Sequence, residues 1–304
     1  MTHSSYQSQA RSQAASHLEK KANRARMLIS CPDRPGIVAA VSQFLYEQGA
    51  NIVQSDQYSM DPDGGMFFMR LEFDLPDLEQ RIAALQEDFT RVADRFQMRW
   101  SVYRAARRKR IAIFVSREDH CLLELLWQWQ AGDLDAEISM VISNHPDMRE
   151  LVESFGIPYH HIPVTPETKP EAERKQLELT KGKVDLIVLA RYMQILTGKF
   201  IEEFPNRIIN IHHSFLPAFV GSKPYQQAYD RGVKLIGATA HYVTEELDGG
   251  PIIEQDVQRV SHRENVSDLK RIGRHIERIV LARAVKWHIE DRILVHKNKT
   301  VVFV

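Results

Sequence analysis

The stretch "VDLIVLA" (184–190) decides the fold that the sequence predicts. It is nearly continuous in β-branched residues and leucine, which is typical of a strand buried on both faces of a parallel sheet. Further strand-like runs lie at 111–116, 136–143, 158–164 and 207–212, and they alternate with helical patterns at 122–130, 148–155 and 170–181. This alternation predicts an α/β domain with a doubly wound, mostly parallel sheet, whose ligands bind beyond the carboxyl ends of the strands.

A smaller patterned region precedes this sheet. "RMLIS" (26–30) reads as a strand, Asp33 is suited to cap a helix that opens near Pro35, and a second strand starts near Asn51. After a turn at 61–65, the pattern gives a strand at 67–73, a helix at 78–96 and a last strand, "QMRWSVY" (97–103). The order βαββαβ predicts a ferredoxin-like sandwich over residues 25–103.

Length and composition agree with two globular domains. The chain has 304 residues, more than the roughly 100 to 200 residues of one domain. Forty basic and forty acidic residues cancel, so no overall charge attracts nucleic acid or an anionic membrane. The only cysteines, Cys31 and Cys121, are far apart in the sequence, which argues against a disulfide framework and fits a reducing, cytoplasmic setting. No apolar run approaches the roughly 20 residues of a membrane span, and we expect residues 1–24 to form a flexible tail.

The basic run "RAARRKR" (104–110) separates the two patterned regions. Such a run either contacts RNA or forms a solvated linker, and the lack of interleaved aromatic residues favours the linker. A second domain is then expected over 111–304. Its first strand is followed by "SREDHCLLEL" (116–125), which contains no glycine, so the backbone cannot closely approach a pyrophosphate and a dinucleotide site is not expected.

The stretch "INIHHSFLPAF" (209–219) places two histidines at the end of a predicted strand. Adjacent residues of a strand point to opposite faces, so His212 and His213 do not share one metal coordination shell, whereas Asn210 and His212 project side by side. An amide next to an imidazole offers donors to a carbonyl oxygen that becomes an oxyanion. Asp248, in a turn before two glycines, can orient an imidazole and hold a water molecule. The residues alone leave two roles open for His212, a packed structural histidine or a member of an acyl-transfer site.

The phrase "PDRPGIVAAVSQFLYEQGANI" (32–52) resembles the opening of an ACT domain. ACT domains bind small effectors, often amino acids, at a strand-to-helix loop, and the resemblance implies an effector site at Asp33, Gly36 and Asn51. The alternative is that Pro35 and Gly36 only make a tight turn and the module serves dimerisation. ACT-like sheets often pair, so the resemblance also implies a homo-oligomer.

The stretch "NIHHSFLPAFVGSKPYQQAYDRGVKLIGATAHYVTEELDGGPIIEQ" (210–255) resembles the core of the folate-dependent formyltransferases. The resemblance implies a catalytic set of Asn210, His212 and Asp248. It also implies that two loops bind the pterin of 10-formyltetrahydrofolate, with candidate contacts at Arg191, Met193, Gln194, Ile195, Leu196, His241, Val243 and Glu245. Plain core packing is the alternative for Met193, Ile195 and Leu196, and His241 is either a hydrogen-bond partner of the catalytic set or structural.

An ACT-like module followed by a formyltransferase-like domain resembles, over the whole chain, the formyltetrahydrofolate deformylase family. This resemblance implies hydrolysis of 10-formyltetrahydrofolate to formate and tetrahydrofolate, in one-carbon and purine metabolism, with no metal and no tightly bound cofactor. Asp119 and Glu118 add negative charge where a ribonucleotide phosphate would lie, and "ILVHKNKTVVFV" (293–304) is long enough only for a hairpin, not for the C-terminal barrel of the tRNA-using relatives.

His213 stands where the transferases commonly have proline, and it either positions the attacking water or points into the core. Three other functions are weighed against hydrolysis. They are formyl transfer to a small amine, hydride transfer on a nucleotide-binding sheet, and ligand sensing without catalysis.

Overall fold

A computed structural model describes residues 21–61, 64–218 and 224–304 of the chain. Most of the predicted tail, and positions 62 and 63 of the predicted turn, therefore lie outside the described residues. The chain divides into two compact units. The first comprises the residues up to Arg107 together with 290–294 and 303–304, and the second comprises 108–289 and 295–302.

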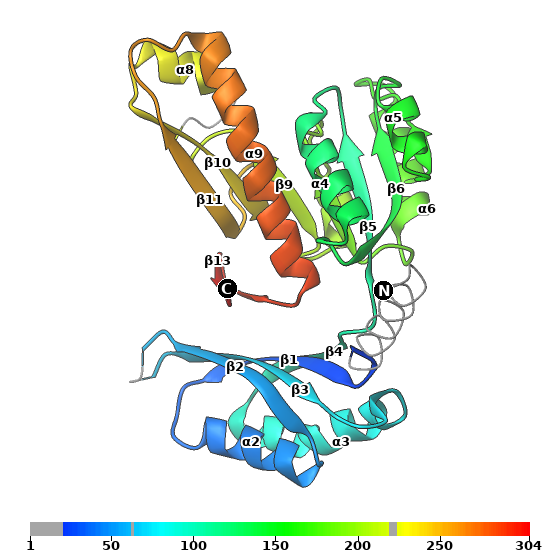
Figure 1. Cartoon of the computed structure of the whole chain (residues 1–304), viewed down its shortest axis with the longest axis vertical. Helices are drawn as coiled ribbons and strands as arrows, with labels where there is room; N and C mark the ends of the chain where they lie inside the picture. The colour runs from blue at the N-terminus through cyan, green and yellow to red at the C-terminus, as the bar shows by residue number, and fades with distance from the viewer. Residues whose placement is uncertain (1–20, 62–63, 219–223) are drawn as a thin grey trace, which may run out of the picture. The chain divides into compact units, whose positions relative to one another are not determined.

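The first unit is a four-stranded antiparallel sheet in the order β2-β3-β1-β4, with two helices on one face (Figure 1). Its elements are β1 (Arg24–Pro32), α2 (Ile37–Glu47), β2 (Asn51–Ser59), β3 (Met66–Asp74), α3 (Leu78–Phe96) and β4 (Arg99–Arg104). Alternate residues of β1 and β3 meet the apolar faces of α2 and α3 in one core that includes Ile29, Phe73, Leu45 and Phe89. The βαββαβ prediction is confirmed.

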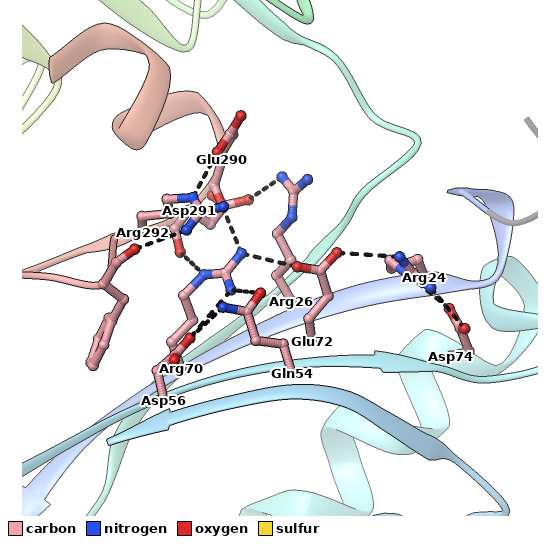
Figure 2. A network of polar contacts seen from close by, with 11 residues as sticks. Arg24, Arg26, Gln54, Asp56, Arg70, Glu72, Asp74, Glu290, Asp291 and Arg292 are labelled. Atoms are coloured by element: carbon pink, nitrogen blue, oxygen red, sulfur yellow. Dashed lines mark hydrogen bonds and ion pairs between the residues drawn. The ribbon is translucent and has the colours of Figure 1, made fainter. Parts of the chain in front are cut away.

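The other face of this sheet carries a polar network around Arg70 of β3, which is 1% exposed (Figure 2). Its Nε donates to the carbonyl oxygen of Asp291 (2.9 Å), and its Nη2 donates to the carbonyl of Glu290 (3.2 Å) and to Glu72 (3.2 Å). Arg26 of β1 also contacts the Asp291 carboxylate. These bonds fix residues 290–294 on the first unit, so the structure differs from the prediction that everything after residue 111 belongs to the second domain.

The connection between the two units is shorter than the predicted linker 104–110. Arg104 belongs to β4 and pairs with Glu79 (2.5 Å), and β5 (Lys109–Val115) already includes Lys109 and Arg110. Arg108 and Arg110 form ion pairs with Asp135 and Asp185. The run was predicted to be a solvated linker because it has no interleaved aromatic residues, but carboxylates from other elements neutralise several of its charges.

The second unit is a seven-stranded sheet in the order β11-β10-β9-β8-β5-β6-β7. The pairs among β9, β8, β5, β6 and β7 are parallel, and β10 is antiparallel to both β9 and β11. After β5 the elements are α4 (His120–Ala131), β6 (Ala136–Ser143), α5 (Arg149–Ser154), β7 (Tyr159–His161), α6 (Lys169–Thr180), β8 (Leu186–Leu189), α7 (Gly198–Glu202), β9 (Ile208–His212), α8 (Pro224–Asp230), β10 (Leu235–Tyr242), β11 (Ile252–Arg259) and α9 (Val266–Ile289).

Helices cover both faces of this sheet, which explains the continuous apolar runs of its central strands. Ala112 and Phe114 of β5 lie in a core with Ala172 of α6 and Phe200 of α7. The other face is covered by α9, which packs on β9, β10 and β11 and against α4 (Figure 1). The predicted doubly wound, mostly parallel sheet is confirmed. Because the chain moves outward from β5 through β6 to β7 and then returns to β8 on the other side, β5 and β8 flank the switch point where ligands bind in such folds.

The last segments, β12 (Ile293–His296) and β13 (Lys299–Val302), pair in a two-stranded sheet, as the predicted hairpin requires. Within the described ranges, none of the helices combines the length and the apolar character that a membrane crossing needs.

Candidate active site

Strands β9 and β10 bring the predicted amide and imidazole together. Asn210 and His212 are two residues apart on β9 and share a face of the sheet. The antiparallel register with β10 sets His241 directly opposite Asn210 and Thr239 opposite His212. The Asn210 Nδ2 lies 3.2 Å from His241 Nε2 across this pair. The predicted pair of Asn210 and His212 is therefore joined by a third side chain, that of His241.

Asp248 reaches the same place from the loop between β10 and β11. Its backbone has a left-handed conformation (φ 55°), which aspartate tolerates better than most residues. A Cβ at Gly250 would lie 1.8 Å from the carbonyl oxygen of Tyr242, so only glycine lets the loop return this close to β10. The loop places Asp248 Oδ2 3.2 Å from His212 Nδ1 and its Oδ1 3.7 Å from His241 Nε2.

The hydrogen bonds assign the tautomer of the His241 ring. Its Nδ1 lies 2.9 Å from the carbonyl oxygen of Tyr242, which can only accept, so Nδ1 carries the proton. Its Nε2 then accepts from Asn210 Nδ2. An amide nitrogen has two hydrogens, so one N–H of Asn210 remains for a ligand while the other fixes the orientation of the side chain.

The hydrogen bonds of His212 involve only one of its two ring nitrogens. The hydrogen bond from His212 holds the pKa of Asp248 well below its usual range, so the carboxylate is ionised at neutral pH. It therefore accepts from His212 Nδ1–H. The other ring nitrogen, Nε2, is buried and has no hydrogen-bond partner in the described part of the chain. A buried orphan atom of this kind requires an explanation, and a reaction centre is one.

His213 connects the catalytic candidates to a second set of polar residues that includes Tyr225. Its ring centroid lies 5.3 Å from that of His212 and 6.0 Å from that of Tyr225. Burial, and then the charge of Arg191, lower the pKa of His213 to about 4, so this ring is neutral at physiological pH. The sequence left open whether His213 positions the attacking water or points into the core. The ring borders a cavity that Arg191 and Glu277 also line.

The candidate pterin contacts separate into exposed and buried side chains. Met193 and Ile195 are 58% and 62% exposed in the loop after β8, whereas Tyr192 and Leu196 of the same loop are buried. Leu196 is buried in the core and packs with Phe200, so its side chain follows the core-packing alternative. Val243 is half-buried against the same core.

The remaining pterin candidates also differ in exposure. Gln194 is half-buried and Glu245 is exposed. The ring of His241 is buried and bonds to Asn210, which fits a supporting partner rather than an open contact surface. Arg191 turns toward Glu277, with its Nε 3.5 Å from Oε2.

The ACT candidates are only partly brought together. Asp33 and Gly36 border one hollow beside Tyr58 and Phe67. Asn51 does not join them. It begins β2, whereas the hollow lies at the far end of that strand near Ser59, eight residues or about 26 Å away. Asp33 also does not cap the helix, because α2 starts after Gly36 and Asp33 accepts a hydrogen bond from the Ser59 hydroxyl instead.

The sequence did not reveal Glu277, Tyr225, His120 or the position of Arg191. Glu277 is 1% exposed and accepts hydrogen bonds from Tyr225 (2.5 Å) and from His120 Nε2 (2.8 Å). One signal was present. Glu277 lies on the apolar stripe of α9, between Ile276 and Val280, where a carboxylate is out of place unless it has buried partners.

Comparisons with known proteins agree along both units. A family model for the ACT domain matches residues 25–90, and a model for formyl transferases matches residues 109–285. The formyltetrahydrofolate deformylase of Bacillus subtilis is 61% identical over 282 residues, which cover 92% of this chain and 94% of that protein. The Escherichia coli formyltetrahydrofolate deformylase is 43% identical over 281 residues, covering 90% and 95%.

Solved structures give the same assignment. The crystal structure of a formyltetrahydrofolate deformylase from Pseudomonas syringae superposes with a TM-score of 0.89 at 50% identity, covering 97% of this chain and 99% of that one. The glycinamide ribonucleotide transformylase 1 of Symbiobacterium toebii, with a TM-score of 0.61 at 30% identity, covers 65% of this chain and 95% of its own. On these identities, on two matched domains and on a shared fold from end to end, the chain belongs to the formyltetrahydrofolate deformylase family.

Proposed function

We propose that this chain hydrolyses 10-formyltetrahydrofolate to tetrahydrofolate and formate, at the site formed by Asn210, His212 and Asp248. The names of its relatives support this activity. The observation that carries the site is the ionised Asp248 bonded to His212 Nδ1 while His212 Nε2 stays buried and unpaired. That arrangement provides an oriented base without a side-chain nucleophile, which suits transfer of a formyl group to water.

In the first step, His212 Nε2 takes a proton from water as the water oxygen attacks the formyl carbon. Asp248 orients the ring and stabilises the imidazolium that forms. Asp248 is a poor base itself, because a carboxylate whose pKa lies far below 7 binds a proton weakly at neutral pH. This favours proton removal through His212 over direct removal by Asp248.

In the second step, the tetrahedral intermediate collapses. The free N–H of Asn210 donates to the oxyanion while the negative charge is present. The bond between the former formyl carbon and N10 then breaks, N10 receives the proton from His212 Nε2, and formic acid ionises to formate. His212 returns to its neutral state and Asp248 remains ionised, so the cycle is balanced.

The flat pterin of the substrate has an apolar surface beside this centre. In the proposal Met193 and Ile195 contact the ring faces, and backbone groups near Gln194, Val243 and Glu245 read its polar edge. Met193 and Ile195 are exposed in the loop that follows β8, and Leu189 of β8 pairs with Asn210, which favours this assignment over core packing. In this proposed pterin site, the contribution comes from backbone groups or from neighbouring side chains in the case of Arg191, Leu196 and His241.

The first unit has the features of an effector module. Asp33 and Gly36 border a hollow of about 670 Å³, which is large enough for an amino acid, and we propose a small effector there in a homo-oligomer. Cys31 and Cys121 are buried and unpaired, which fits a reducing, cytoplasmic location.

The deciding experiment measures formate from 10-formyltetrahydrofolate without any acceptor amine, and then with a series of small amines. Hydrolysis predicts stoichiometric formate and tetrahydrofolate in both conditions. Formate release that requires an amine, or the appearance of a formylated amine in place of formate, would establish a transferase instead. Absence of any turnover would establish a binding protein.

A further inference from the structure

A cavity of about 400 Å³ lies in the second unit beside the catalytic pair, and the proposed reaction as described so far does not use it. Its wall includes His213, Tyr225, Arg191, Glu277, Lys270 and Arg274. His213 lines the cavity, and its ring centroid lies 5.3 Å from that of His212. The charges that act on His213 include those of Asp248 and His212 as well as those of Arg191 and Glu277. The cavity is therefore adjacent to the reacting atoms rather than remote from them.

Arg191 adopts a strained backbone conformation beside this cavity. Its backbone is left-handed (φ 62°), an uncommon conformation for a residue other than glycine, asparagine or aspartate. Such strain persists where the surrounding structure enforces it, and it concentrates at functional positions. Its guanidinium is largely buried, and among the described residues its Nε and Nη1 have no hydrogen-bond acceptor, although Glu277 lies within ion-pair distance.

Glu277 faces Arg191 but does not hydrogen-bond to its Nε or Nη1, and it has two closer partners. Oε1 accepts from the Tyr225 hydroxyl, and Oε2 accepts from His120. Burial alone would raise the pKa of Glu277, but the His120 hydrogen bond and the Arg191 charge outweigh it and hold the pKa at about 2. Gly273 of α9 permits this arrangement, since a Cβ there would lie 1.9 Å from the Tyr225 hydroxyl oxygen.

The charges of the wall favour an anion. Arg191 and Arg274 are balanced by Glu277 and Glu118, at 3.5 and 3.4 Å, whereas Lys270 has no ion-pair partner in the part of the chain that the structure describes. His120, Cys121 and Glu277 offer atoms within 4.8 Å of one another, as metal ligands do. The guanidinium of Arg191 lies 3.5 Å from a Glu277 oxygen, however, and its positive charge opposes a cation there.

We propose that this cavity is the acceptor side of the active site, from which water enters past His213 and into which the formate anion leaves, bound by Arg191 and attracted by Lys270. The inference rests on the proposed function. When formate forms, the carboxylate of Asp248 repels it and the cations of the cavity attract it, so the charges direct the product away from the folate. At about 30 Å³ per water, the cavity holds formate together with several waters. The same cations disfavour protonated amines as acceptors.

The test measures binding of sodium formate to the full-length protein without folate, by saturation-transfer NMR at constant ionic strength. A ligand of three non-hydrogen atoms has an affinity ceiling near roughly 1 mM, so the titration extends to several times that concentration. Arg191→Gln removes charge-assisted hydrogen bonds, and we expect about tenfold weaker binding or more. Lys270→Gln removes an exposed charge and should weaken binding by about two- to fivefold.

Arg271→Gln is the matched control. Arg271 follows Lys270 directly on α9, its side chain is 76% exposed, and it does not line this cavity. Formate should bind to this variant as it does to the unchanged protein. Lys270→Gln keeps the test decisive if Arg191→Gln does not fold, because position 270 is exposed.

Lack of saturable formate binding, or equal binding by all three variants, would overturn the proposed cavity role while leaving hydrolysis intact. Conversely, formate binding that depends on Arg191 and Lys270 in a protein that releases no formate would overturn the proposed function alone.

Discussion

Two buried polar groups of this molecule differ in how completely their atoms are paired. In the first unit, Nε, Nη1 and Nη2 of Arg70 each have an acceptor, and they hold residues 290–294 on the sheet (Figure 2). In the second unit, His212 Nε2 and two nitrogens of Arg191 have none among the described residues. Because an unpaired buried polar atom costs roughly 1 to 3 kcal/mol, a group that only stabilises a fold tends to be saturated.

The comparison points to His212 and Arg191 without reference to relatives. The paired Arg70 guanidinium rigidifies its surroundings and requires nothing else, although Nε of its neighbour Arg26 is itself unpaired. We infer that the unpaired atoms of His212 and Arg191 are maintained by the rest of the fold and are completed by a ligand. The four predictions below test this difference, beginning with the largest effect.

Asp248→Asn should lower kcat by about 10⁴, because an amide no longer stabilises the imidazolium and can turn His212 into the wrong tautomer. The substitution keeps the size of the side chain. Folate binding should therefore survive, and equilibrium binding of 10-formyltetrahydrofolate to the variant provides the check. Formate release near the unchanged rate would refute the role of Asp248.

Arg70→Met should lower the stability of the first unit by about 3 to 5 kcal/mol, since partly buried carboxylates and two carbonyl oxygens lose their donor. Figure 2 shows the groups that would be left. Hydrogen exchange of β3 amides measures the loss for this unit by itself. Arg99→Met, on the exposed start of β4, is the matched control, and a similar loss there would show that the Arg70 network is not special.

Asn210→Ala should reduce kcat by about 10² to 10³, the usual effect of losing one oxyanion donor, while KM for the folate changes little. The variant also removes the hydrogen bond to His241, so His241→Gln is a useful companion. If His241 only orients Asn210, its substitution should cost less than the loss of Asn210 itself. An equal or larger cost would make His241 the more important donor.

The smallest effect is a pH dependence of stability in the second unit. Burial lowers the pKa of His213 to about 4 and that of His288 to about 3, below the roughly 6.5 of an unfolded histidine. The unfolded state therefore binds more protons, so stability is complete above about pH 6.5 and falls as the pH decreases toward the folded pKa values. His213→Asn should reduce this slope by up to about 1.4 kcal/mol per pH unit, measured by denaturant unfolding between pH 6.5 and 5. An unchanged slope would mean that His213 is protonated in the folded protein.

Much of the fold and part of the site follow from local patterns. The period of two places Asn210 and His212 on one face, and the continuous run around Val188 predicts a strand covered on both faces. The same patterns did not reveal that Arg104, Lys109 and Arg110 lie in strands, because the carboxylates that neutralise several charges of this run come from distant parts of the chain.

The effector prediction shows a second limit. Asp33, Gly36 and Asn51 lie close in the sequence, but the helix between Gly36 and Asn51 carries the chain to the opposite end of the sheet. Proximity in sequence is therefore a poor measure across a helix of 11 residues, which is about 16 Å long.

The sequence by itself determined the two domains, the order of their strands and helices, and which residue types could carry acyl chemistry, since these depend on periodicity and turn residues within short windows. Only the tertiary structure decided which atoms remain unpaired. His120 and Glu277 are 157 positions apart and Tyr225 and Glu277 are 52 apart, so no local pattern joins them. Packing of α9 on the sheet brings them together, and burial then sets which polar atoms are paired and which are left for water and formate.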